Sequence, residues 1–262
     1  MEPLPGGARL SGLLTTPVRP GRPRSPYFHG GGFALLSAAS MLVDGMCRRF
    51  CRELGAVVVS VNYRLAPEHR YPAAYDDCVG VLRYLGYSST GLPAGDISVL
   101  VDLSRCFLAG DSAGGNIVHH PCFGGEERTG AELRLEGVAP VLNIRRTDWS
   151  WRAFLPEGAD RKSGTTQRRT SQARRARSPS WRRRSRRRWW RSAGWTRCKT
   201  GSGVLQRRYV AMLRRKGKGV HVVEFPGAIH AFYCFPELPD SARLLEEIKA
   251  IVIGSTIHHP AA

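Results

Sequence analysis

A serine held between glycines is the first feature of this sequence that could do chemistry. The run Gly-Asp-Ser-Ala-Gly-Gly at 110–115 fits Gly-x-Ser-x-Gly and follows the short apolar run "CFLA". Side chains two positions either side of the serine would clash in a sharp strand-to-helix turn, so the glycines predict such a turn. The turn would expose the Ser112 hydroxyl as a nucleophile and aim the Ala113 N–H at the reacting oxygen. A purely structural glycine turn before a helix would also explain this sequence.

A glycine triplet and a late histidine complete the chemical pattern. "HGGGF" at 29–33 places Gly31 81 residues before Ser112. Consecutive glycines let backbone N–H groups approach an oxyanion, which would supply the second half of an oxyanion hole. His230 lies in "FPGAIHAF", on a loop after a late strand, where a general base is required. A serine that precedes its histidine is the chain order of the α/β-hydrolases.

Strands and helices must alternate to position these groups. The β-branched run at 56–64 predicts a strand buried on both faces, as in a parallel sheet. We expect another strand to end within 27–33, where it runs into the glycine turn, and further strands just before Ser112 and at 219–225. We expect helices at 72–85, directly after Ser112 and at 203–218. A closing helix should span 240–254, capped by Asp240 or Ser241 and stopped by Gly254. The fold class is therefore α/β, a mostly parallel sheet flanked by helices.

Four acidic residues have expected structural roles. Asp76 and Asp77 should anchor the helix at 72–85 to the sheet, as should Glu68 in its turn, and Asp111 should brace the turn that carries Ser112.

One segment departs from the composition of the rest. Of 40 basic residues, 16 lie in residues 161–200, a window without Asp, Glu, Leu, Ile, Val or Phe; the remaining 24 oppose 21 acidic residues. The net charge of +19 therefore describes this window, and we expect the window to be disordered and to supply no core strand. Taken at face value, Arg runs with Trp would favour nucleic acid or nuclear import.

Five motifs together resemble one family: "YFHGGGF", "VVVSVNYRLAPEHRYPAAYDD", "GDSAGGNIVHH", "FGGEERT" and "IHAFY". They are similar to plant carboxylesterases of the hormone-sensitive-lipase group, to which the gibberellin receptors are also similar. The resemblance covers most of 27–160 and 203–253. It implies an α/β-hydrolase that hydrolyses small carboxylic esters without metal or organic cofactor. By this resemblance Ser112 attacks, His230 is the base, and Gly31, Gly32 and Ala113 donate to the oxyanion. The receptor branch typically lacks the catalytic histidine, so His230 favours an esterase.

The chain departs from this family where the triad acid should stand. The family has an Asp in a Gly-Gly-x-Asp-Pro-like turn before the histidine, but no Asp or Glu lies between Asp160 and Glu224. Read one base early, the codons of Trp195 and Thr196 overlap in GAC, an Asp codon, and their neighbours permit Gly-Gly-Leu before it and Pro-Leu after it. We therefore hypothesise that about residues 162–202 are translated out of frame. The alternative is a genuine basic arm that binds nucleic acid.

We expect sequence elements near the nucleophile to be shortened. Pro121 ends the helix after Ser112 early, and the "FGGEERT" that follows resembles a later family segment, so we expect a strand to be missing there. The resulting organisation is an irregular segment 1–26, hydrolase core with cap elements 27–160, basic segment 161–202, core 203–254 and tail 255–262. Seven scattered Cys and no signal-peptide pattern predict a cytoplasmic protein, with the nucleus as the alternative, and no membrane span.

The predicted partner is a small ester, with no metal and no nucleic acid, and the missing acid predicts impaired catalysis. Two other functions stay open. One is an inactive, gibberellin-receptor-like binding protein, and the other is a nucleic-acid-binding protein that uses residues 161–200.

Overall fold

The computed structural model describes residues 9–14, 24–88, 106–119, 128, 130–138, 141–159, 193–197 and 203–257. The chain divides into two compact units, Met1–His120 with Tyr233–Ala262 and Pro121–Phe232, and each is described by itself. The first unit contains β1 (Arg9–Leu14), β2 (Arg24–Phe28), α1 (Met41–Leu54), β3 (Val57–Asn62), α2 (Ala73–Ser88), β4 (Ala109–Gly110), α3 (Ala113–His119) and α9 (Pro239–Ile257). The second contains α4 (Gly130–Leu135), α5 (Ile144–Phe154), β5 (Ala193–Arg197), α8 (Gly203–Arg215) and β6 (Val220–Glu224), and the 3-10 helix η3 (Phe232–Cys234) leads back into the first.

The sheet of the first unit has the strand order β1-β3-β2-β4. β2 runs parallel to both β3 and β4, while β1 pairs antiparallel with β3 at the edge. The valines of β3 are buried, as expected for a strand covered on both faces. The mostly parallel α/β sheet is thus confirmed. Because β2 and β4 are parallel neighbours, the loop after Phe28 and the turn after Gly110 leave the same edge of the sheet.

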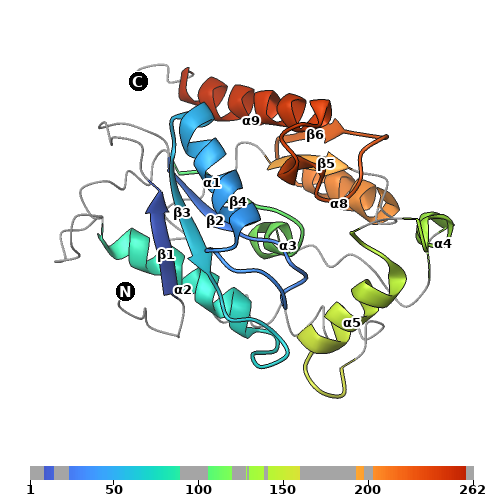
Figure 1. Ribbon diagram of the computed structural model, residues 1–262. Helices are drawn as coiled ribbons and strands as arrows, with labels where there is room; N and C mark the ends of the chain where they lie inside the picture. The colour runs from blue at the N-terminus through green and yellow to red at the C-terminus, as the bar shows by residue number, and fades with distance from the viewer. Residues whose placement is uncertain are drawn as a thin grey trace. The chain divides into compact units, whose positions relative to one another are not determined.

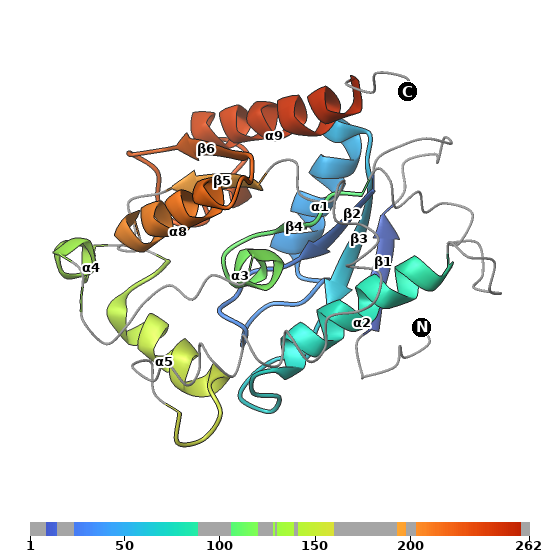
Figure 2. The same ribbon diagram turned by 180° about the vertical axis from the view of Figure 1, so that it is seen from behind.

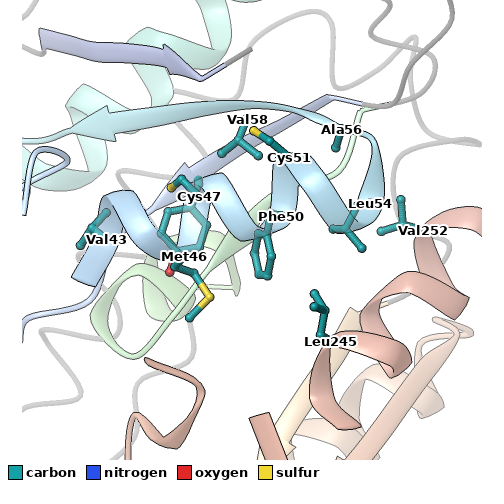
Figure 3. Close-up of a cluster of buried hydrophobic side chains, with 11 residues drawn as sticks. Val43, Met46, Cys47, Phe50, Cys51, Leu54, Ala56, Val58, Leu245 and Val252 are labelled. Carbon is teal, nitrogen blue, oxygen red and sulfur yellow. The ribbon is translucent and has the colours of Figure 1, made fainter. Parts of the chain in front are cut away.

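Helices cover both faces of this sheet. Figures 1 and 2 show α1 and α9 on one face and α2 and α3 on the other. The buried side of α1 forms the centre of the core. Figure 3 shows Leu54 of α1 pointing toward Val252 of α9, and Phe50 toward Leu245. The whole cluster comprises Tyr27, Val43, Met46, Cys47, Phe50, Cys51, Leu54, Ala56, Val58, Leu245 and Val252.

A buried ion pair fixes α2 to the sheet. Asp77 of α2 is 0% exposed, and its carboxylate accepts hydrogen bonds from the Arg64 backbone N–H at 2.9 Å and from the Arg64 Nη2 at 2.7 Å. Arg64 follows β3 directly, so the pair joins the helix to the end of the strand. The predicted anchoring role of Asp77 is confirmed.

The second unit has a two-stranded parallel sheet, β5-β6, with α8 packed on β6. The α5 helix begins where the Asn143 side chain accepts from the Arg146 N–H at 2.9 Å. Its Asp148 pairs with Arg128 at 2.6 Å. The α8 helix ends before Gly217, whose φ of +67° is the left-handed value that glycine adopts freely.

Three expectations about elements are wrong. Part of the segment 1–26 forms β1, because the free edge of β3 offers unpaired backbone groups to any extended segment. The basic window supplies the strand β5, since a ladder needs backbone hydrogen bonds and Trp195 and Thr196 favour extended backbone. The other residues of the window, 161–192 and 198–200, lie outside the described part of the chain.

The third correction concerns the closing helix. The α9 helix starts at Pro239 and continues past Gly254, because one interior glycine costs only about 1 kcal/mol. Ser241 does not cap it: its Oγ donates to the Tyr233 carbonyl and accepts from Arg49. We expected one strand to be missing after α3, and part of that region lies outside the described ranges. The described residues between α3 and β5 form the helices α4 and α5.

Candidate active site

The turn that carries Ser112 has the geometry that its glycines predict. A Cβ on Gly114 would lie 1.8 Å from the Phe28 carbonyl oxygen, and one on Gly110 would lie 2.6 Å from the Gly114 backbone. Neither position can therefore hold a side chain. Ser112 has φ +48°, a left-handed conformation that costs a non-glycine residue about 1–2 kcal/mol. This strained serine between β4 and α3 is a nucleophile elbow in its geometry.

The glycine loop after β2 lies beside this serine. A Cβ on Gly30 would lie 3.2 Å from the Ser112 Cβ. Gly31 and Gly32 have φ +102° and +64°, and a Cβ on Gly31 would lie 2.0 Å from the Leu35 carbonyl oxygen. The loop can thus be built only with glycine at Gly31, and its backbone comes close to the elbow.

The carbonyls of this loop point into the protein. The Gly31 carbonyl accepts from the N–H groups of Ala34 and Leu35 at 3.1 and 2.9 Å. The N–H and C=O of one trans peptide point in opposite directions, so the Gly32 N–H points away from that turn. Among the described residues, none accepts a hydrogen bond from the N–H of Gly31, Gly32 or Ala113. Backbone N–H groups that are not used elsewhere are the donors that an oxyanion requires.

A tyrosine that the sequence analysis did not single out holds the loop in place. Tyr63 is only 2% exposed. Its hydroxyl donates to the His29 carbonyl at 2.7 Å and lies 3.3 Å from the Gly30 carbonyl. The His29 ring stacks on the Tyr63 ring, with centroids 4.3 Å apart, and its Nδ1 lies 2.7 Å from the Gly30 carbonyl. Burial lowers the pKa of His29, which favours the neutral ring. His29 thus shapes the loop.

Asp111 braces the elbow through two hydroxyls. Its Oδ1 accepts from Tyr27 at 2.7 Å and its Oδ2 from Tyr233 at 2.9 Å. The first bond reaches β2, and the second reaches η3, which follows His230 along the chain. The predicted bracing role is confirmed, with two partners that the sequence did not reveal.

His230 lies on a closed loop of the second unit. The loop begins at Phe225, directly after β6, and Phe225 and Phe232 are both 1% exposed with ring centroids 4.9 Å apart. The Ala228 N–H donates to the Phe225 carbonyl at 3.1 Å, and Ala231 has φ +63°. Two buried rings therefore close the base of the loop, and the half-buried His230 lies between them in the sequence.

Comparisons with known proteins agree with this geometry. Residues 26–138 match a family model described as the alpha/beta hydrolase fold. The structure of the chain also resembles that of an esterase of Pyrobaculum calidifontis, with TM-score 0.72 and 24% identity over 97% of this chain and 83% of that one. The chain has the α/β-hydrolase fold. At this identity the structural likeness shows the fold alone.

Curated relatives of this α/β-hydrolase domain are plant proteins of two kinds. A gibberellin receptor of Arabidopsis thaliana is 49% identical over 52% of this chain and 43% of its own length. Carboxylesterase 20 of Arabidopsis thaliana is 42% identical over 52% of this chain and 47% of its own. The family resemblance inferred from the motifs is confirmed. The chain spans about half the length of the curated relatives it matches.

Four of the five predicted site residues, Ser112, Ala113, Gly31 and Gly32, lie in the first unit, where Gly30 lies against Ser112. The fifth, His230, belongs to the second unit, so its pairing with Ser112 stays a prediction. No group of three or more potential metal ligands occurs among the described residues. Within the same ranges, every helix is too short or too polar to cross a membrane.

Proposed function

We propose that this protein is a serine hydrolase of small carboxylic esters that works through an acyl-serine intermediate and is slowed by the lack of a triad acid. The observation that carries the proposal is the strained Ser112 packed against Gly30 of the glycine loop, where no described residue accepts from the N–H groups of Gly31, Gly32 or Ala113. The Ser112 oxygen attacks the ester carbonyl, and its proton passes to His230. The N–H groups of Gly31, Gly32 and Ala113 stabilise the oxyanion.

The remaining steps need only these groups and water. The tetrahedral intermediate collapses, and the alcohol leaves with the proton that His230 received. Water then attacks the acyl-serine, again losing a proton to His230. Collapse of the second intermediate releases the carboxylic acid and restores Ser112.

Chain connectivity supports His230 as the base. Tyr233 donates to the carboxylate of Asp111, the residue before Ser112. His230 precedes Tyr233 by three residues, and consecutive Cα atoms are 3.8 Å apart, so the covalent chain keeps the two Cα atoms within about 11 Å. Among the histidines of the sequence, His230 also stands in the chain order of the α/β-hydrolases.

The missing acid sets the expected rate. In serine proteases, replacing the triad Asp by its amide lowers kcat about 10⁴-fold, because the histidine loses its orientation and the imidazolium its counter-charge. No Asp or Glu is available between Asp160 and Glu224. We therefore expect slow turnover in this chain, and a rise of about 10³–10⁴-fold when residues 162–202 are replaced by the reading in the neighbouring frame.

A p-nitrophenyl acetate assay tests the proposal. Purified protein should release p-nitrophenolate slowly, and Ser112→Ala should abolish the enzymatic part of that release. The chain with the reframed segment should be much faster and equally dependent on Ser112. Release that is unchanged in Ser112→Ala in both chains would contradict the proposed function. Sequencing the transcript across the window tests the frame hypothesis by itself.

The curated relatives favour a second candidate function. Four gibberellin receptors match this chain at 42–49% identity. A receptor-like protein would bind a small carboxylic acid with the same loop and elbow, without covalent chemistry. Calorimetric titration with gibberellin separates the two functions: tight binding that survives His230→Ala, together with absent esterase activity, supports the receptor.

A further inference from the structure

Asp111 occupies an unusual electrostatic position beside the nucleophile. Both of its carboxylate oxygens accept from tyrosine hydroxyls, at 2.7 Å from Tyr27 and 2.9 Å from Tyr233. Among the described residues, no Lys or Arg lies within ion-pair distance of this carboxylate. Its charge is therefore stabilised by two neutral O–H donors that come from distant parts of the sequence.

The surroundings of Asp111 leave little freedom of movement. Its backbone N–H donates to the Phe28 carbonyl at 3.4 Å, and a Cβ on Gly30 would lie 2.4 Å from its Oδ2. The carboxylate thus lies against the glycine loop, and only the absence of a side chain at Gly30 makes room for it. Burial, and then the charge of Asp111, raises the pKa of Tyr27 well above its ordinary value, so this hydroxyl stays a donor.

The two tyrosines belong to elements that adjoin two loops. One is the glycine loop at 29–33, and the other is the loop that contains His230. Tyr27 lies in β2, two residues before His29. Tyr233 lies in η3, three residues after His230, and its carbonyl also accepts from the Ser241 Oγ at 3.1 Å. One carboxylate therefore joins the end of β2, the elbow and the start of the C-terminal segment.

We propose that Asp111 is a positioning residue: by bridging the hydroxyls of Tyr27 and Tyr233, it fixes the elbow against β2 and tethers the chain that leaves the His230 loop. Its effect on chemistry, which rests on the proposed function, acts through the orientation of Ser112 and of the residues before Tyr233. A hydrogen bond to a charged group contributes enough for its loss to raise local opening about tenfold or more.

Hydrogen exchange tests the tether without any need for catalysis. Backbone amide exchange, followed by mass spectrometry, should be about tenfold faster in residues 229–238 of Tyr233→Phe and of Asp111→Asn than in the unmodified chain. Asp111→Asn keeps the shape of the side chain and one acceptor oxygen, so Tyr233→Phe should add less in that background than alone. Tyr84→Phe, which removes a hydroxyl from α2, is the control.

Covalent labelling tests the effect on the nucleophile. The probe is p-nitrophenyl diethyl phosphate: the Ser112 oxygen bonds to phosphorus, p-nitrophenolate leaves, and the serine proton passes to the base. Tyr233→Phe should lower the maximal labelling rate about tenfold, with an unchanged half-saturating probe concentration and unchanged final labelling. Global destabilisation would instead reduce the labelled fraction. Ser112→Ala reports labelling elsewhere.

The outcomes separate the tether from the proposed function. Exchange in 229–238 that is the same in Tyr233→Phe as in Tyr84→Phe would overturn the tether, whatever the labelling shows. Faster exchange with an unchanged labelling rate would overturn the positioning role. If exchange is faster in Tyr233→Phe but the probe never labels Ser112, the result supports the tether and contradicts the proposed function.

Discussion

The steric requirement for glycine at the elbow gives a sharp prediction for Gly114→Ala. An alanine Cβ would lie 1.8 Å from the Phe28 carbonyl oxygen and 2.7 Å from that of His29. Ordinary C···O contacts are about 3.3 Å or longer, so α3 and the end of β2 would have to separate by about 1.5 Å. An extra methylene in a packed interior costs about 1–3 kcal/mol when side chains can yield. Here backbone meets backbone, so we expect about 3 kcal/mol or more.

The neighbouring glycine is the matched control. A Cβ on Gly115 would lie 3.3 Å from the Gly110 carbonyl oxygen, a tight but tolerable contact, and alanine is favoured over glycine in a helix by about 1 kcal/mol. Gly115→Ala should therefore stay within about 1 kcal/mol of the unmodified chain. Urea unfolding followed by circular dichroism measures both, and Gly114→Ala should lower the midpoint by about 1 M. Equal midpoints for the two variants would refute the steric account of the elbow.

Three further predictions concern stability. Gly45, in the middle of α1, has open space around the position of a Cβ, so Gly45→Ala should raise the free energy of unfolding by about 0.5–1 kcal/mol, and a lower thermal midpoint would contradict this. Asp77→Asn should lower the free energy of unfolding by about 3 kcal/mol, because it removes the charge that pairs with Arg64. The control Asp76→Asn should cost much less. Equal losses of unfolding free energy in the two variants, measured by urea unfolding, would argue against a special role for Asp77. Burial raises the pKa of Cys47 from 9.0 to about 12 and that of Cys234 to about 11, so the stabilising contribution of each thiol is complete below pH 9 and is lost as the pH rises toward these values. The slope should reach about 1.4 kcal/mol per pH unit for each thiol and should be smaller in Cys47→Ala, whereas a pH-independent urea midpoint between pH 9 and 11 would contradict it.

Local patterns in the sequence predicted the parts of the site that depend on backbone sterics. Gly31, Gly110 and Gly114 are required by close backbone approaches, and such requirements leave a residue signature. The buried valines of β3 likewise marked a strand without reference to its neighbours. These elements were correct because their cause lies within a few residues of each position.

Long-range contacts left no such signature. Tyr233 and Asp111 are 122 residues apart, and Tyr63 reaches the His29 carbonyl over 34 residues. A tyrosine hydroxyl has many possible acceptors, so its type and position alone do not identify the partner. The strand β1 was missed for a related reason: its pairing is determined by the open edge of β3 rather than by its own Pro- and Gly-rich surroundings.

The most direct test of the central claim is the site of covalent labelling by p-nitrophenyl diethyl phosphate. The account predicts one phosphoryl adduct per chain, located by peptide mass spectrometry on Ser112, and no adduct when the protein is first unfolded in urea. Labelling of other residues with Ser112 left unmodified, or labelling that is as fast in the unfolded chain, would contradict it.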